Sequence, residues 1–429
     1  MVINRDKYLN KLIERKHNGL IKLVTGIRRC GKSYLLNTIF VKHLLECGIK
    51  NDHIICVNFD DLDNIDLREI RNANKYLKSK IIDDDMYYFI LDEVQLMYNK
   101  DDSENSTAFF EVLNSLMHLN NTDIYATGSN SRFLSSDIIS TFRGRSDEIR
   151  VHPLTFKEYY NALLNINSNT TKEDALEKYT LYGGLPLSLT YTSYDAISDY
   201  LKNTFKEIYK LDIKERYKIN NNIEFDEIVN FISSQIGSQI SYLSLSKTFK
   251  SVKNKSISDK TIKRYIDFLI GSYILNQAKR YDVKGKKYIN SSYKLYFEDL
   301  GLRNARINFS QNEKTHLMEN LIYNELIERG YNVDTGDISI VEKRKDDDTF
   351  IRKKLEIDFV ATKFNRKYYI QSAYSINDPD KLMQEQRSLL AIKDSNEKII
   401  ITYNMTIPRI TDEGIKIISI YDFLLGDIF

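Results

Sequence analysis

Short apolar runs alternate with longer amphipathic segments over the first 155 residues. The runs are the candidate strands 21–25, 53–59, 87–93, 123–129 and 147–154. Between them, segments such as 33–48 and 106–120 carry apolar residues at the spacing of one helix face. This alternation predicts an α/β fold, in which a parallel sheet is covered by helices on both faces.

The pattern changes near residue 196, where helical segments follow one another. Residues 224–237, 244–252 and 258–275 have helical spacing, and strand-like runs at 274–282 and 286–297 then flank a short turn. Three short helices and a hairpin predict a winged helix, with the third helix as the recognition helix. The alternative is a helical lid that contains basic residues but does not bind DNA.

The last segment is again α/β. It contains a helical pattern at 316–330, two strand-like runs at 353–362 and 366–374, a strand at 398–404 and a strand–helix end at 414–425. A chain of 429 residues exceeds the size of one ordinary core. We therefore expect three domains, at 1–195, 196–305 and 306–429.

A phosphate-binding motif lies between the first strand and the first helix. Residues 26–33 read GIRRCGKS, which matches G-x-x-x-x-G-K-S. In this motif backbone N–H groups surround a phosphate, the lysine reaches the β- and γ-phosphates, and the serine hydroxyl binds Mg²⁺. The residues expected to bind the nucleotide are Gly26, Ile27, Arg28, Arg29, Cys30, Gly31, Lys32, Ser33 and Tyr34.

A second motif completes the expected ATP site. The apolar run 86–91 leads directly into Asp92 and Glu93, as in a buried parallel strand that ends in acidic residues. We expect Asp92 to hold Mg²⁺ and Glu93 to activate the attacking water. The alternative for this pair, a solvated strand end, loses weight because the phosphate loop precedes it.

Further catalytic candidates follow the fourth strand. Ser129 and Asn130 are placed to position the water or to sense the γ-phosphate. The alternative is that Asn130 or Ser131 caps the next helix. Arg143 and Arg145 are candidate arginine fingers, whether in the same chain or from a neighbouring subunit. Surface ion pairing is the competing interpretation for both arginines.

The net charge of +2 hides a basic module. Residues 241–294 hold 13 Lys or Arg and 3 Asp, a local charge of +10, which leaves −8 for the rest of the chain. Such a module predicts an anionic partner, with DNA as the first candidate. The expected DNA-binding residues are Lys260, Lys263 and Arg264 on the third helix and Lys284, Lys286 and Lys287 in the hairpin turn.

Several classes of protein are not indicated. The three cysteines, Cys30, Cys47 and Cys56, form no C-x-x-C pair, so neither a disulfide framework nor a zinc site is expected. No apolar run approaches eighteen residues, and the first ten residues do not resemble a signal peptide. We therefore expect a cytoplasmic protein with no membrane partner.

The order of the motifs resembles one family along nearly the whole chain. The segments 23–36, 87–95, 126–136, 142–160 and 180–189 follow each other as in AAA-type, AAA+/STAND-like P-loop ATPases of bacteria and archaea that carry a C-terminal domain of unknown function. The resemblance implies a winged helix behind the ATPase core. It also implies that Gly184 and Pro186, in a G-x-P turn, contact adenine.

The end of the chain resembles the PD-(D/E)XK restriction-endonuclease-like fold. Glu319, Asp358 and Gln371 fall where nucleases of that fold have metal-binding residues. Ala373 replaces the lysine that would steady the hydroxide, although Lys363 or Lys367 could substitute for it. A degraded nuclease kept as an interaction or DNA-binding module is therefore the favoured interpretation.

These patterns predict a Mg²⁺-dependent ATPase whose ATP site is coupled to DNA binding or to assembly. One alternative is a regulatory protein that ATP switches with little turnover, with a protein partner or a homo-oligomer as the output. The other is an ATP-regulated nuclease that uses the C-terminal domain.

Overall fold

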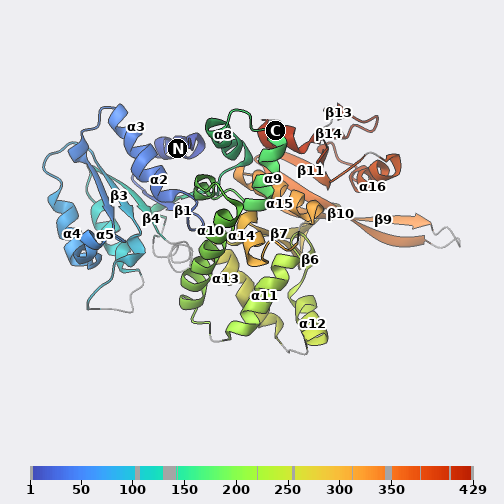
Figure 1. Cartoon of the computed structure of the whole chain (residues 1–429), viewed down its shortest axis with the longest axis horizontal. Coiled ribbons are helices and arrows are strands. Elements are labelled where there is room, and N and C mark those ends of the chain that lie inside the picture. The colour runs from blue at the N-terminus through green and yellow to red at the C-terminus, as the bar shows by residue number, and fades with distance from the viewer. Residues whose placement is uncertain are drawn as a thin grey trace.

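Five parallel strands form the first sheet, in the order β2-β3-β4-β1-β5 (Figure 1). Their bounds are β1 Ile21–Thr25, β2 Ile54–Asn58, β3 Tyr87–Asp92, β4 Thr122–Thr127 and β5 Ser146–Arg150. All five were predicted, and their parallel pairing confirms the expected α/β fold of this part. The computed structural model describes residues 3–101, 107–128, 142, 144–219, 221–253, 257–311, 313–343, 350–376, 378–404 and 407–426.

Helices cover both faces of this sheet, as the alternation predicted. On one face α4 (Ile70–Ser79) and α5 (Ala108–Met117) pack against the odd-numbered residues of β3. On the other face the even-numbered residues of β3 meet α1 (Asp6–Glu14) and a continuous helix that follows the phosphate loop. Because both faces are covered, every residue of β3 is buried.

The helix after the phosphate loop contains a π-helical stretch. It consists of α2 Lys32–Tyr34, the π-helix η1 Leu35–Phe40 and α3 Val41–Glu46. Short 3₁₀ turns connect the other elements of this part: η2 Asn51–His53, η3 Leu62–Arg68 and η4 Val94–Leu96.

A helical region links the first sheet to the rest of the chain (Figure 1). Its elements are α8 Phe156–Ile166, α9 Lys172–Tyr182, the 3₁₀ turn η5 Pro186–Thr190, α10 Tyr194–Glu207, the π-helix η6 Ile208–Glu215, α11 Asn222–Ser234, α12 Tyr242–Lys253, α13 Asp259–Gly271 and α14 Leu300–Arg306. The three predicted helices correspond to α11, α12 and α13. Ser258 caps α13, since its side chain accepts a hydrogen bond from the Thr261 amide.

The expected hairpin is present, but it belongs to a larger sheet. The strands β7 (Leu275–Asp282) and β8 (Lys287–Phe297) pair antiparallel, and β6 (Gln239–Ile240) adds to β8. β7 also pairs in parallel with β9 (Asn332–Lys343) of the C-terminal part. The boundary expected at 305/306 therefore lies within a region that one nine-stranded sheet holds together.

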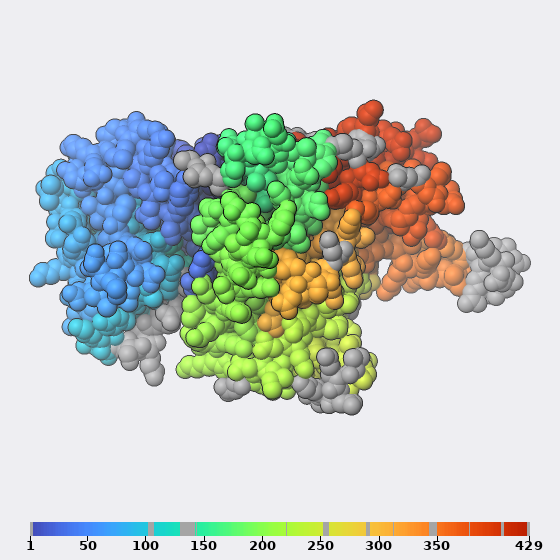
Figure 2. All heavy atoms as spheres, viewed as in Figure 1, coloured from blue at the N-terminus to red at the C-terminus, as the bar shows by residue number. Residues whose placement is uncertain are grey.

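The C-terminal part completes this sheet, whose order is β13-β14-β12-β11-β10-β9-β7-β8-β6. Its remaining elements are α15 Lys314–Glu328, β10 Phe350–Lys363, β11 Arg366–Ala373, α16 Pro379–Leu390, β12 Glu397–Thr402, β13 Arg409–Ile410, β14 Lys416–Ser419 and α17 Ile420–Leu425. β10 and β11 form the predicted hairpin, whereas β9 and α16 were not predicted. Figure 2 shows β9 and β10 extending beyond the body of the molecule.

Within the described ranges, no helix combines the length and the apolar character that a membrane span requires.

Candidate active site

The phosphate loop joins the end of β1 to the start of α2, and two glycines allow its shape. Gly26 has φ +135°, and a Cβ atom there would lie 2.0 Å from the Val151 carbonyl oxygen. Gly31, the residue before α2, has φ +101°. Neither position accepts a side chain without strain. The loop therefore has the strand–turn–helix context that the motif requires.

The side chains of the loop face different surroundings. The Lys32 ammonium donates to the carbonyl oxygens of Gly26 and Ile27, at 3.0 and 3.2 Å. Cys30 is buried, and its thiol donates to the Val151 carbonyl oxygen at 3.3 Å. Ser33, in contrast, is exposed at the start of the helix. The positive end of the helix at this point favours an anion.

The two predicted acidic residues lie at the carboxyl end of β3, and both form a hydrogen bond with one hydroxyl group. The Thr127 hydroxyl on β4 donates to Asp92 and accepts a hydrogen bond from the Glu93 amide at 3.2 Å. Asp92 is only 4% exposed, and no cationic side chain of the described ranges pairs with it. A buried carboxylate without a protein cation suits a metal or a metal-bound water.

Glu93 sits where a general base is expected to sit. Its backbone has φ +54°, the left-handed conformation that is uncommon for a residue with a side chain. Burial raises the pKa of Glu93, whereas the hydrogen bond from Gln95 and the charges of Lys32 and Arg28 oppose the increase. A carboxylate with a raised pKa is better able to take a proton from water.

A cavity of about 500 Å³ brings most of the predicted nucleotide-binding residues together with Glu93, although Gly26, Ile27 and Asp92 do not line it. It is lined by Ile3, Arg5, Arg28, Arg29, Cys30, Gly31, Lys32, Ser33, Tyr34, Glu93, Leu154, Pro186, Leu187 and Thr190. The phosphate loop and Glu93 form its polar end, and Pro186 with its neighbours contributes apolar surface. This volume falls within the range of small-molecule sites in proteins.

The Gly183–Gly184 turn before Pro186 is held by a buried aspartate. Asp299, at the start of α14, accepts a hydrogen bond from the Gly184 amide at 2.7 Å. A Cβ atom on Gly183 would lie 2.2 Å from the Asp299 carboxylate. Burial raises the pKa of Asp299 to about 6, despite the opposing backbone hydrogen bonds. Asp299 follows the carboxyl end of β8, so a residue just beyond that strand holds the turn that precedes Pro186.

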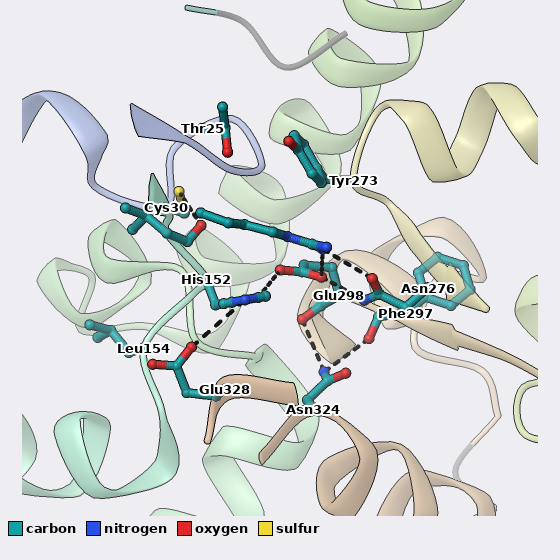
Figure 3. A network of polar contacts seen from close by, with 12 residues as sticks. Thr25, Cys30, His152, Leu154, Tyr273, Asn276, Phe297, Glu298, Asn324 and Glu328 are labelled. Carbon is teal, nitrogen blue, oxygen red and sulfur yellow. Dashed lines mark hydrogen bonds and ion pairs between the residues drawn. The ribbon is translucent and has the colours of Figure 1, made fainter. Parts of the chain in front are cut away.

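The neighbouring residue, Glu298, binds the two residues that flank Val151, whose carbonyl oxygen contacts the phosphate loop. Its carboxylate binds Arg150 at 2.6 Å. It also binds His152 Nδ1 at 2.5 Å (Figure 3). Burial alone would raise the pKa of Glu298, but the charges of Arg150 and His152 lower it to about 2. Val151 lies between these two residues and contacts the loop through Cys30.

Glu298 and Asp299 are functional candidates that the sequence reasoning missed. They stand in the segment YFEDLG, which follows a strand much as Asp92 and Glu93 do. That acidic pair at a strand end was the available signal. Only the fold shows that it faces the first domain rather than solvent. Thr127 was also missed, because a threonine within a strand carries no distinctive pattern.

Some predicted catalytic residues are not brought into the cavity. Arg145 precedes β5 at the amino edge of the sheet, opposite the phosphate loop, and donates to Asn114 at 2.7 Å. A role for Arg145 at the site of its own chain is therefore not supported, because the length of the sheet separates them. Asn130 lies outside the described residues, as do Ser129 and Arg143.

The C-terminal acidic residues form a different kind of site. The Lys294 ammonium, from β8, lies 2.8 Å from Glu319, 2.5 Å from Glu356 and 3.6 Å from Asp358. Lys294 is 4% exposed. Burial lowers its pKa, but the three carboxylates outweigh that effect and raise it. Burial and the charge of Glu319 raise the pKa of Asp358 to about 8.

Gln371 does not join this cluster. Its side-chain oxygen accepts a hydrogen bond from Ser388 of α16 at 3.3 Å. Its neighbours on alternate positions, Tyr369 and Ala373, pack into the core beneath α16. Side chains alternate along a strand, so Gln371 and Ala373 share the α16 face, whereas Glu319 comes from α15. The predicted set of metal-binding residues is therefore not assembled.

The predicted DNA-binding residues are exposed, whereas Arg280 and Lys294 of the wider basic module are largely buried against acidic partners. Lys260, Lys263 and Arg264 lie on the exposed side of α13, where Lys263 pairs with Asp267 at 2.5 Å. Lys284, Lys286 and Lys287 are exposed at the turn between β7 and β8. Lys294 therefore adds no exposed charge to the module, because the acidic cluster neutralises it inside the protein.

The comparison with family models agrees with the first part of this description. Residues 18–160 match the family model of the AAA domain, and residues 173–313 match a domain of unknown function (DUF8612). Among solved structures, a Walker-type ATPase of Pyrococcus abyssi is 18% identical, covering 71% of this chain and 96% of that chain with a TM-score of 0.48. AMPPCP-bound DnaA from Aquifex aeolicus is 14% identical, covering 62% and 86%, with a TM-score of 0.33.

Two relatives align along nearly their whole lengths. An uncharacterized protein of Haemophilus influenzae is 30% identical over 429 residues, which is 99% of each chain. An uncharacterized protein of Methanocaldococcus jannaschii is 31% identical over 434 residues, covering 98% of this chain and 88% of the relative. The chain therefore belongs to the family of these two proteins, and its first part is an AAA-type P-loop domain built on a five-stranded parallel sheet.

Proposed function

We propose that the chain binds ATP with Mg²⁺ in the cavity at the phosphate loop and hydrolyses it. The observation that carries the proposal is the convergence of Lys32, Ser33, Glu93 and Pro186 on one cavity of about 500 Å³. These residues come from three separate segments of the chain. A phosphate-binding end, a carboxylate and an apolar wall are the parts that ATP hydrolysis requires.

Each residue has a role that its position supports. Lys32 would leave the loop carbonyls and bind the β- and γ-phosphates. Ser33 and Asp92 would hold Mg²⁺, which neutralises charge on the phosphates when it is bound. Glu93 would accept a proton from the attacking water. Pro186 and Leu187 offer apolar surface to the base.

Lys32→Ala tests nucleotide binding. We expect calorimetric titration with ATP and Mg²⁺ to show binding to the wild type and at least a tenfold loss in the variant, because a charged phosphate contact is removed. Lys42→Ala is the matched control, since Lys42 is exposed in the same helix and pairs with the exposed Glu46. Equal affinities of wild type and Lys32→Ala would contradict the assigned site.

DNA binding through α13 is a second candidate function. The exposed Lys260, Lys263 and Arg264 favour it, because they form a basic helix surface near a cap that fixes the start of the helix. We expect the triple substitution of these residues by glutamine to weaken duplex binding in low salt. Fluorescence anisotropy checks this, and the binding of the wild type should decline with added salt. An unchanged affinity in the triple variant would sink this function.

The alternative functions predict different rates of ATP hydrolysis and different products. A protein that ATP switches for assembly would change its oligomeric size with ATP while hydrolysing it slowly, which light scattering with a parallel phosphate-release assay distinguishes. A C-terminal nuclease has less support, because Lys294 occupies the acidic cluster and Gln371 faces α16. Nicking of a plasmid that disappears in Asp358→Ala would restore it.

A further inference from the structure

Two consecutive arginines of the phosphate loop are held by acidic residues of one helical segment. Arg28 donates from Nε and Nη2 to the two carboxylate oxygens of Asp212, at 3.0 and 2.9 Å. Arg29 donates from Nη2 to Glu207 at 2.7 Å. Glu207 ends α10, and Asp212 lies in η6, which continues that helix. Both arginines line the nucleotide cavity.

The two pairs differ in burial and geometry. The Asp212 side chain is 3% exposed, and Arg28 is the cation that its two oxygens bind. The second pair has a single hydrogen bond, with Arg29 35% and Glu207 44% exposed. A bidentate pair with a buried carboxylate is the stronger of the two, because solvent screens it less. Arg28 and Asp212 therefore form the tighter link between the loop and the helix.

Arg28 is also within electrostatic reach of the catalytic carboxylate. Its charge is among the effects that oppose the increase in the pKa of Glu93. A polyphosphate in this cavity brings several negative charges to the same loop. Guanidinium groups bind phosphate oxygens in the same forked geometry that they use for carboxylates. Phosphate and Asp212 would thus compete for one group.

We propose that Arg28 exchanges its partner when nucleotide binds, leaving Asp212 for a phosphate oxygen. This inference rests on the proposed nucleotide site and names Asp212 as the residue that registers its occupancy. Lys32 is the phosphate-binding cation that the motif supplies. Arg28 is a second phosphate-binding cation, which pairs with Asp212 of the helical region as long as no nucleotide is bound.

The exchange has a structural consequence for η6. Asp212 left without Arg28 is a buried carboxylate without a cation, which is strongly unfavourable unless the surroundings change. Its own backbone carbonyl accepts a hydrogen bond from Ser272, at the end of α13, at 3.2 Å. Tyr209 of η6 donates to Asp226 of α11 at 2.7 Å. A shift of η6 is therefore transmitted to the helices that precede the hairpin.

The affinity for MgATPγS tests the exchange. Asp212→Asn removes the competing charge, so we expect its dissociation constant to fall by about 5- to 50-fold, since the bound state no longer has to break the pair. Arg28→Ala should bind more weakly than the wild type, and Arg28→Ala/Asp212→Asn should bind like Arg28→Ala. Glu207→Gln is the matched control, with a change below about threefold, because its pair is exposed.

Different failures point to different causes. Weaker or unchanged binding in Asp212→Asn, or unchanged binding in Arg28→Ala, would overturn the exchange while leaving the nucleotide site intact. Wild type that binds no better than Lys32→Ala would overturn the site itself, and the exchange with it.

A measurement on the wild type covers the case in which Asp212→Asn does not fold. Hydrogen exchange of the amides of residues 208–215 should become faster with MgATPγS, because the pair that anchors η6 is broken. The helix α4 packs on the face of the first sheet that is turned away from η6, so its amides serve as the internal reference. Exchange of 208–215 that stays equal or becomes slower would overturn the proposal.

Discussion

The protein contains two acidic sites that look alike in the sequence and differ in the fold. Asp92 and Glu93 lie at the end of β3, and Glu319 and Asp358 lie where α15 meets β10. Both pairs were candidates for metal-assisted phosphate chemistry. At the first, Glu93 lines a cavity, and no cationic side chain among the described residues pairs with Asp92. At the second, the ammonium group of Lys294 fills the place between the carboxylates.

The difference shows what turns acidic residues into a site for chemistry. A buried carboxylate needs a compensating positive charge, and the protein either supplies it or leaves room for a bound cation. Lys294 supplies it at the second site, from a strand that belongs to another predicted domain. At the first site the protein supplies hydroxyl and amide groups, together with space. The first site is therefore suited to turnover, and the second to holding β8 against α15 and β10.

Glu93→Gln tests the comparison with the largest expected effect. We expect steady-state phosphate release to fall by about 10²- to 10³-fold, since the proton acceptor is lost, while ATP affinity stays within a few fold. Asp358→Asn is the matched change at the other site and should leave turnover within about twofold. Full turnover in Glu93→Gln would show that the base is assigned to the wrong residue.

Lys294→Met tests the structural role of the second site. Removal of the ammonium leaves Glu319 and Asp358 buried together, so we expect the free energy of unfolding to fall by about 3–5 kcal/mol in denaturant titration. Lys263→Met is the control, because Lys263 is an exposed lysine paired with one aspartate and should cost below about 1 kcal/mol. If the two variants are equally stable, the cluster does not hold the sheet and α15 together.

The pH dependence of stability tests the environment of Asp358. Its pKa is about 8 in the folded protein and 3.8 ordinarily, so folding favours the protonated form. This contribution is present at low pH and declines as the pH rises from about 4 towards 8. We expect the wild type to lose stability between pH 6 and 8 more steeply than Asp358→Asn, by up to about 1.4 kcal/mol per pH unit. Parallel stability curves would contradict the raised pKa.

Thr127→Val tests the hydrogen bonds of the Thr127 hydroxyl at the first site and has the smallest expected effect. The hydroxyl donates a hydrogen bond to Asp92 and accepts one from the Glu93 amide. Its loss should lower phosphate release by about three- to tenfold, which corresponds to the free energy of one or two hydrogen bonds. Thr127→Ser keeps the hydroxyl and should retain most of the activity. Turnover that falls equally in both variants would show that loss of the hydroxyl is not the cause, because Thr127→Ser keeps it.

The nucleotide half of the protein was largely readable from the sequence. The strands that end at Thr25 and Asp92 were predicted within a residue or two, because local apolar runs define buried parallel strands. The loop between Gly26 and Ser33 depends on neighbours in the chain, so its shape follows from local sequence. Arg145 shows the limit of such reasoning, since a position near a strand does not say which edge of the sheet it occupies.

The other half depended on contacts between distant segments. Lys294 counted as part of a basic surface, yet it is neutralised by Glu319 and Asp358, 25 and 64 residues further along the chain. Gln371 was placed beside these acids by its position in a motif, but strand alternation turns it towards α16. The hairpin of β7 and β8 was predicted correctly, and its pairing with β9 was not.

The sequence by itself determined that the chain has a phosphate loop on an α/β sheet with acidic residues at the right strand end. These features are local, because they arise from apolar periodicity and from glycines at positions that no other residue tolerates. Only the tertiary structure decided which charges meet. It placed Arg28 on Asp212, Glu298 behind the loop and Lys294 among the acids. Charge pairing acts over a few ångströms in space and is independent of separation along the chain, so only the folded arrangement reveals it.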